Sequence, residues 1–241
     1  DDEAGNTFVK NGRKIITVNK NDDPFRRRFT ILHEIAHHAL GLPSKHGEKL
    51  ASSELERVGT RPPEEVLCDV FAAECLVPSH LIQPLTDQFP FTAATIQDLS
   101  DRFEASKQCV ASRFARSSRD LLAYVFSESS TARIAITSNS LRESGIWIGL
   151  SQIPENSAAA TAIKKGSFLE TADMDASDWS SSDSAERFAC YEEAIHMKKW
   201  EQTISLLTFE EVITRSSSAN SRSEDDGLLA ELTGHLPWPK R

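Results

Sequence analysis

The sequence predicts an α+β protein whose first 120 residues are mainly helical and whose remainder is rich in strands. Three observations lead to this class. A long helix near the N-terminus carries two histidines one turn apart, a pair of shorter helices occupies the middle of the chain, and strand-like segments begin near residue 120. Helices and strands segregated along a chain in this way are typical of α+β folds.

The first predicted elements are a hairpin and a long helix. Two short strands are predicted at residues 8–9 and 14–18, joined by an Asn-Gly turn. The helix follows, because Asp23 is a favourable N-cap and Pro24 suits the first helical position. Its apolar residues recur at helical spacing up to Gly41, and glycine commonly ends a helix.

The long helix contains the motif H-E-x-x-H between His33 and His37. On a helix these two histidines are one turn apart and project from the same face. They can hold one Zn²⁺ ion, and Glu34 lies where it can take a proton from water held by that ion. The alternative interpretation is a surface helix that carries histidines by coincidence. His38 lies on another face and is expected to pack rather than to bind metal.

A hydrolytic zinc site needs a third protein ligand. His46 lies in a glycine- and proline-rich loop, and Pro43 stands where the extended form of the motif has its third histidine. A second helix is predicted over residues 62–77, with acidic residues in its first turn. Glu65 on this helix is the candidate ligand, and Asp69 is the candidate carboxylate that orients a ligand histidine. Spacing alone leaves a second role for Glu65 equally open, namely compensation of the helix dipole.

Two helices are predicted for the middle of the chain, at residues 92–102 and 106–119. With the turn between them they resemble a helix-turn-helix, and the second helix carries basic side chains that a DNA-reading helix uses. We favour a helical connector that packs on the N-terminal part, because helical hairpins are common and the chain is acidic.

From residue 120 onwards the sequence is dominated by segments rich in β-branched and aromatic residues. A short helix is expected at residues 157–163 and a Ser- and Asp-rich loop at residues 171–184. Residues 214–227 are expected to be flexible and residues 228–232 to form a last helical turn. These elements suit an antiparallel α+β domain, which serves either as a ligand sensor or as a purely structural unit. Strands are predicted at residues 121–126, 132–137, 145–150 and 203–209.

Composition narrows the class of protein. A net charge of −9 and a pI of about 5.3 argue against general nucleic-acid binding by the whole chain and suit a basic protein partner. A hydrophobic content of 39% supports one to three small globular domains. The four cysteines form no C-x-x-C pair and are expected to be reduced thiols. We find neither a signal peptide nor an apolar run long enough to span a bilayer, and therefore expect a cytoplasmic protein without a membrane partner.

The segments of the two N-terminal helices together resemble the ImmA/IrrE family of metallopeptidases. That family shows an R-F-T-x-x-H-E-x-x-H block, which begins here at Arg28, and a second block of the form E-x-x-A-N-x-F-A-A, which begins here at Glu65. The resemblance covers about residues 8–82. It departs mildly where Cys68 and Asp69 replace the commoner Ala and Asn.

The resemblance implies a set of functional residues. His33, His37 and Glu65 are expected to be the metal ligands, and Glu34 the general base, of a minimal zincin-like metallopeptidase domain. Zn²⁺ is the expected ion for two imidazoles and a carboxylate, with Mn²⁺ as an alternative.

The longer match is to the IrrE type, the radiation-response regulators, in which the peptidase precedes a helix-turn-helix-like segment and a GAF-like domain. We therefore expect a zincin-like domain at residues 1–85, a helix-turn-helix-like segment at 86–120, and a GAF-like sensor domain with a flexible tail at 121–241. Family members usually carry more sequence before the motif, so we expect either that the chain is a fragment, truncated at its N-terminus, or that the protein lacks the upstream part.

Known members of the family cleave a cytoplasmic XRE-type repressor and release its target genes. The implied function is therefore proteolytic derepression of a stress or DNA-damage response, with a repressor as the protein partner. The alternative is a non-proteolytic DNA-binding or ligand-sensing regulator whose metal site is structural or vestigial. Salt-dependent binding to duplex DNA would favour this alternative.

Overall fold

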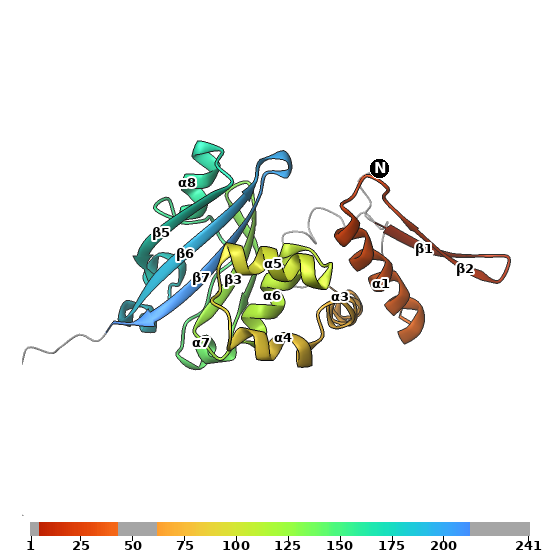
Figure 1. Cartoon of the computed structure of the whole chain (residues 1–241), viewed down its shortest axis with the longest axis horizontal. Helices are drawn as coiled ribbons and strands as arrows, with labels where there is room; N and C mark the ends of the chain where they lie inside the picture. The colour runs from red at the N-terminus through yellow and green to blue at the C-terminus, as the bar shows by residue number, and fades with distance from the viewer. Residues whose placement is uncertain (1–4, 43–61, 213–241) are drawn as a thin grey trace, which may run out of the picture.

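The computed structural model describes residues 5–42 and 62–212, in which eight α-helices and two antiparallel sheets confirm the α+β class. The molecule is elongated, with the N-terminal hairpin at one end, the larger sheet at the other, and helices between them (Figure 1). The strands are β1 (Gly5–Lys10), β2 (Arg13–Val18), β3 (Leu122–Glu128), β4 (Thr131–Thr137), β5 (Leu169–Asp175), β6 (Phe188–Met197) and β7 (Gln202–Glu211). The helices are α1 (Pro24–Leu40), α3 (Pro63–Leu76), α4 (Ser79–Thr86), α5 (Ala93–Phe103), α6 (Lys107–Ser117), α7 (Asn139–Glu143), α8 (Ala158–Lys165) and α9 (Ala176–Trp179).

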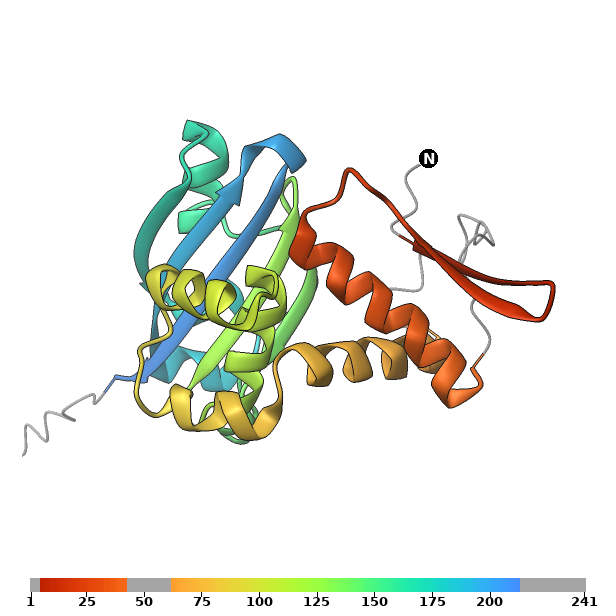
Figure 2. The same ribbon diagram turned by 45° about the vertical axis from the view of Figure 1, so that its right-hand side comes forward.

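Helix α1 begins and ends where the sequence predicts. The carboxylate of Asp23 accepts a hydrogen bond from the amide of Phe25 at 2.8 Å, and Gly41 ends the helix with a positive φ of 65°. The predicted hairpin is confirmed as the antiparallel pair β1–β2, which lies along α1. Figure 2 shows α1 passing across the outer end of α3, with the hairpin beyond it.

Gly5 allows strand β1 to lie against α1. A β-carbon at Gly5 would overlap the methyl group of Thr30 and would come within 3.8 Å of Glu34 Cγ. Any other residue would therefore push the hairpin away from the helix. The absence of a side chain at this position keeps the hairpin beside the helix that carries the H-E-x-x-H motif.

The larger sheet has the strand order β4-β3-β7-β6-β5, and all of its neighbouring strands are antiparallel. Alternate residues of β3 point to opposite faces. Leu122 and Tyr124 join the core formed with α5 and α6, whereas Ala123 and Val125 join the core formed with α8 and α9. The first of these cores extends to Ile82 in α4, so α4, α5 and α6 pack on the same face of the sheet.

Most predicted elements of the C-terminal part are confirmed, but two predictions are wrong. Residues 145–150 form no strand, because Gly145 adopts a φ of 80° and the segment turns away from the sheet after a single buried anchor, Ile146. The predicted loop at residues 171–184 contains most of β5 and all of α9. Strand β6 was not predicted. His46 and the predicted elements at residues 214–232 lie outside the described residues.

Adjacent glutamates of β6 fasten helices to opposite faces of the sheet. The buried Glu192 carboxylate accepts hydrogen bonds from the amides of Ala158 and Ala159 at 2.9 and 3.2 Å, at the start of α8. Glu193 accepts one from the amide of Ala93 at 2.7 Å, at the start of α5. Amides in the first turn of a helix have no partner within the helix, and a carboxylate there satisfies both the amides and the helix dipole.

Replacing Glu192 with Ala is therefore expected to destabilise the protein strongly. The free energy of unfolding should fall by about 1–3 kcal/mol for each of the two buried amides left without an acceptor. Glu193→Ala is the matched control, since its carboxylate satisfies a single, less buried amide, and the expected loss is about 0.5–2 kcal/mol. Urea unfolding of the two variants measures both losses, and an equal loss would contradict this assignment.

The same glutamate should make stability depend on pH. Burial raises the pKa of Glu192 above its ordinary value, against hydrogen bonds from Ser205, Ala158 and Ala159 that lower it. The unfolded chain therefore loses this proton at a lower pH than the folded protein does. Stability should fall as pH rises from the ordinary glutamate pKa to the raised one, and Glu192→Gln should remove that slope from the unfolding curve. An unchanged slope would show that other groups cause it.

Candidate metal centre

Three donor atoms from two helices converge where α1 and α3 cross. His33 Nε2 lies 3.1 Å from His37 Nε2 and 3.1 Å from Glu65 Oε2, and His37 Nε2 lies 3.5 Å from Glu65 Oε1. All three side chains are buried. The helical spacing of the motif aligns the histidines, and the packing of α3 on α1 brings Glu65 to them.

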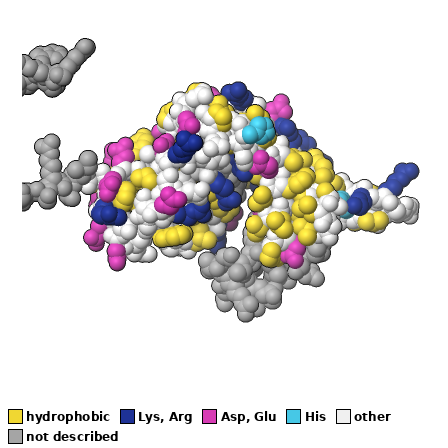
Figure 3. Space-filling model, turned by 90° about the horizontal axis from the view of Figure 1, so that it is seen from below, with side chains coloured by type: hydrophobic (Ala, Val, Ile, Leu, Met, Phe, Trp, Pro, Cys, Tyr) yellow, Lys and Arg dark blue, Asp and Glu magenta, His cyan; other side chains and the backbone are white. Residues whose placement is uncertain are grey.

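The face of α3 that meets α1 is its more polar one. Glu65, Cys68 and Ala72 are buried, whereas Val66 and Val70 are exposed. An ordinary amphipathic helix would bury the valines. The inverted arrangement places a carboxylate in the helix interface and leaves apolar side chains on the surface. Figure 3 shows hydrophobic side chains gathered on the underside of the molecule, in the region of α1 and α3.

Asp69 fixes the protonation and orientation of one histidine. Its Oδ1 atom lies 2.9 Å from His33 Nδ1. A carboxylate oxygen only accepts, so Nδ1 carries the hydrogen and the lone pair of the neutral ring is on Nε2, which faces Glu65 and His37. Burial lowers the pKa of His33. The hydrogen bond to Asp69 and the charges of Asp69, Glu65 and Glu34 together raise it by more, so the pKa is above its ordinary value.

Asp69→Asn should weaken metal binding without removing it. Loss of the charged partner of a ligand histidine typically costs about 10–100-fold in metal affinity. Competition for Zn²⁺ with a coloured chelator measures the change. Asp101→Asn, on the surface of α5, is the control and should bind metal as the wild type does. Equal affinities for the two variants would exclude the orienting role.

The chemistry of the donor atoms fits a divalent cation. Burial, then the charges of Glu65, Asp69 and Glu34, raise the pKa of the Cys68 thiol to about 11, so this neighbour stays protonated. The donors are then two imidazole nitrogens and a carboxylate. A tetrahedral ion with bonds of about 2.0–2.1 Å separates its ligand atoms by about 3.3–3.4 Å, close to the separations of the three donor atoms.

Glu34 and His38 occupy the positions expected from the helical periodicity of α1. Glu34 is fully buried beside the histidines, on the side where β1 passes. His38 points the other way, and its Nε2 atom contacts the hydroxyl of Thr7 in the hairpin. His38 is therefore a packing residue that joins α1 to β1 and is not among the converging donor atoms.

Two arginines make contacts that the sequence did not predict, and these attach the metal-site helices to the α5–α6 pair. Arg28 of α1 donates to the carbonyl oxygen of Glu104 at 2.6 Å and to its carboxylate at 2.8 Å. The buried Arg113 of α6 donates through Nε to Val77 O at 3.0 Å and also contacts Glu74. No spacing rule signals these contacts, because each joins residues more than 35 positions apart in sequence.

Two basic residues of α6 are engaged within the protein. Arg113 is buried against the end of α3, and Lys107 lies 5.1 Å from the centre of the Phe168 ring. The helix itself packs on β3 and β4. These contacts are compatible with the helical connector that we favour for residues 86–120, and both the connector role and DNA binding by this segment stay predictions.

Two helical histidines with a glutamate from a second helix form the ligand set found in known zinc metallopeptidases. Residues 1–115 match the family described as the IrrE N-terminal-like domain. This N-terminal part of the chain is therefore similar to the ImmA/IrrE family of metallopeptidases. The resemblance drawn from the two motif blocks is confirmed.

Two curated relatives carry the name radiation response metalloprotease IrrE. The one from Deinococcus deserti is 34% identical over 96 residues, which cover 38% of this chain and 32% of the relative. The one from Deinococcus radiodurans is 33% identical over 96 residues, covering 38% of this chain and 28% of the relative. The chain thus spans about a third of the length of the curated relatives it matches.

Two further expectations concern the thiols and the membrane. All four cysteines are free, as expected for reduced thiols. Within residues 5–42 and 62–212 there is no helix whose length and apolar character would let it cross a bilayer.

Proposed function

We propose that the chain is a zinc-dependent endopeptidase in which His33, His37 and Glu65 hold the ion. When bound, the ion supplies the positive charge that makes water nucleophilic at neutral pH and polarises the scissile carbonyl. The observation that carries the proposal is the convergence of the three buried donor atoms at 3.1–3.5 Å. Mn²⁺ is the alternative ion, because the same donors suit it.

The other residues of the site have distinct roles in this proposal. Glu34 accepts a proton from the attacking water and returns it to the leaving amine. Its burial beside the histidines supports this role, because a base works only within hydrogen-bonding reach of the proton. Asp69 holds the orientation of the His33 ring through its hydrogen bond with Nδ1. An open edge of the β1–β2 hairpin would bind the substrate as an added strand.

We propose that the substrate is a helix-turn-helix repressor of the XRE type, whose cleavage in the cytoplasm derepresses a stress or DNA-damage response. The names of the two Deinococcus relatives support a regulatory peptidase. The net charge of −9 complements a basic DNA-binding protein. The exposed apolar side chains of Val66, Leu67 and Val70, next to Glu65, offer a surface that suits a protein substrate.

The proposal is tested by mixing the purified chain with helix-turn-helix repressors from the same genome. Zn²⁺ should produce discrete repressor fragments, a chelator should stop their formation, and added Zn²⁺ or Mn²⁺ should restore it. Mass spectrometry of the fragments gives the cleavage site. A chain that binds no metal would favour the non-proteolytic regulator, and a metal-loaded chain that cleaves none of the repressors would refute the proposed substrate.

A further inference from the structure

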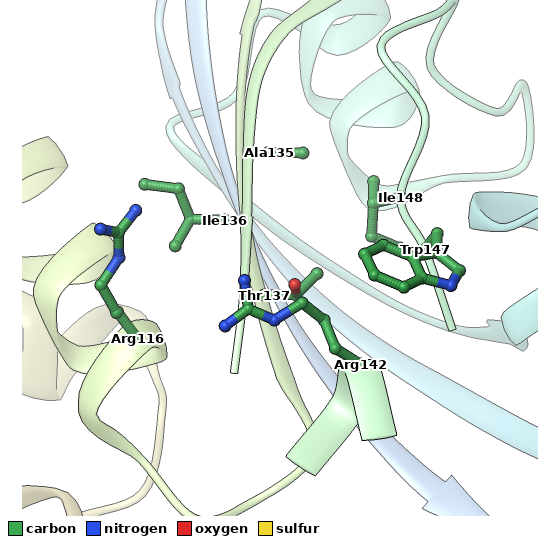
Figure 4. A pocket seen from close by; sticks show the side chains of 7 residues that line it. All are labelled: Arg116, Ala135, Ile136, Thr137, Arg142, Trp147 and Ile148. Atoms are coloured by element: carbon green, nitrogen blue, oxygen red, sulfur yellow. The ribbon is translucent and has the colours of Figure 1, made fainter. Parts of the chain in front are cut away.

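A pocket of about 210 Å³ opens at the edge of the larger sheet, and none of its lining residues belongs to the candidate metal centre. Its floor is the C-terminal half of β4, from Ala135 to Thr137. Figure 4 shows Arg116 of α6 on one side of this strand and Trp147 on the other, with the side chain of Arg142 between them over the end of the strand.

The pocket concentrates positive charge. Among the described residues, neither Arg116 nor Arg142 forms an ion pair with a carboxylate, and the side chain of Arg142 donates a hydrogen bond to the amide oxygen of Asn139. Burial is the main cause that lowers the pKa of Arg116, and the like charges of Arg113 and Arg142 lower it further. Two guanidinium groups held near each other without an acid in a chain of net charge −9 favour an anion between them.

Hydrogen bonds hold the backbone on the α7 side and on the Trp147 side of the pocket. Ser138 is fully buried, and its hydroxyl accepts hydrogen bonds from the amides of Leu122 and Leu141 at 3.2 and 3.1 Å. This holds the start of α7, one turn before Arg142. The amide of Trp147 donates to Ser180 Oγ at 3.3 Å. These hydrogen bonds hold the backbone that carries Arg142 and Trp147.

Trp147 gives the pocket a flat aromatic wall. Its side chain is 61% exposed, although the preceding residue, Ile146, is fully buried. An indole held at the rim of a pocket offers a face on which a planar ring can stack. Guanidinium groups bind carboxylate and phosphate through paired N–H donors. The volume of 210 Å³ is smaller than that of pockets that hold drug-sized ligands, so the ligand has one ring rather than several.

We propose that this pocket binds a small planar organic anion, with a phosphate or carboxylate group between Arg116 and Arg142 and a ring against Trp147. The site is independent of the peptidase function proposed above, because it shares no residue with the metal centre. It would give the C-terminal domain a ligand of defined chemistry.

The test is a titration of the full chain, followed by NMR of the tryptophan indole groups and by calorimetry. The probes are phenyl phosphate and benzoate, which carry a ring and an anion, inorganic phosphate, which lacks the ring, and benzyl alcohol, which lacks the charge. At least one ring-bearing anion should bind and should shift the Trp147 signal, and it should bind more tightly than inorganic phosphate or benzyl alcohol. Raised salt should weaken the binding.

Variants decide whether the pocket is the site. Arg116→Gln and Arg142→Gln should each lower the affinity for the ring-bearing anion by about tenfold or more. Arg133→Gln, a change of the same kind on β4 outside the pocket, should have no effect. Trp147→Leu should make phenyl phosphate bind no more tightly than inorganic phosphate. Trp200→Leu, at another exposed indole, should leave the difference in affinity unchanged.

Thermal unfolding establishes whether each variant is folded. If Arg142→Gln is not folded, Arg142→Lys, which keeps the charge, replaces it. An intermediate affinity for Arg142→Lys supports the proposal, because Lys keeps the charge but loses the paired N–H donors. Binding of neither ring-bearing anion, or binding that the pocket variants leave unchanged, would overturn it.

Discussion

Glu34→Gln is expected to retain one metal ion per chain and to lower kcat/KM for repressor cleavage by about 10²–10⁴-fold, the usual contribution of a general base. The amide has nearly the shape of the carboxylate but cannot accept a proton from water. The metal should remain, because the three converging donor atoms come from other residues. Metal analysis and a cleavage assay on the same preparation separate the two effects.

The comparison requires that Glu34→Gln be as well folded as the wild type. Glu34 is buried against Gly5 and the hairpin, so thermal unfolding of the variant is the necessary control. Undiminished cleavage by a folded, metal-loaded Glu34→Gln variant would refute the general-base role. Loss of metal together with activity would instead indicate that Glu34 supports the metal ligands.

Glu65→Gln has the second large expected effect, which is on metal affinity. Removing a charged donor should weaken Zn²⁺ binding by more than the about 10–100-fold expected for a residue that only orients a ligand. Cleavage should be lost in parallel. Chelator competition measures the affinity, and activity at saturating Zn²⁺ shows how much function is recovered.

Glu64→Gln is the matched control for this change. Glu64 lies in the same first turn of α3 and compensates the same helix dipole, but it is not one of the converging donors. It should therefore bind metal as the wild type does. If Glu65→Gln also binds metal normally, Glu65 serves only the helix dipole, the role that its sequence position left open.

The histidine pair of the site was predictable from local sequence, and its third donor was not. One helical turn separates His33 from His37, so the Asp23 cap and the Gly41 terminator were enough to place both on one face. Glu65 lies on another helix, where acidic residues are favoured in the first turn for electrostatic reasons alone. The family resemblance implied the ligand role, and the crossing of α3 over α1, with its valines turned outwards, places Glu65 beside the histidines.

The C-terminal part illustrates a second limit of sequence patterns. Strand β6 carries Glu192 and Glu193 at its centre, and paired glutamates disfavour a strand. They are tolerated because the start of α8 and the start of α5 lie on opposite faces of the sheet and satisfy them. Residues 145–150 look like a strand, but their apolar side chains are divided between the core, at Ile146, and the rim of a pocket, at Trp147.

The central claim is that His33, His37 and Glu65 together bind one divalent ion. X-ray absorption spectroscopy at the zinc edge, on the full chain loaded with one equivalent of Zn²⁺, tests it most directly. We expect a zinc ion with nitrogen and oxygen ligands only, two of them imidazoles. In His37→Ala we expect one imidazole ligand to be lost. A sulfur ligand from Cys68, or failure to retain zinc after gel filtration, would contradict it.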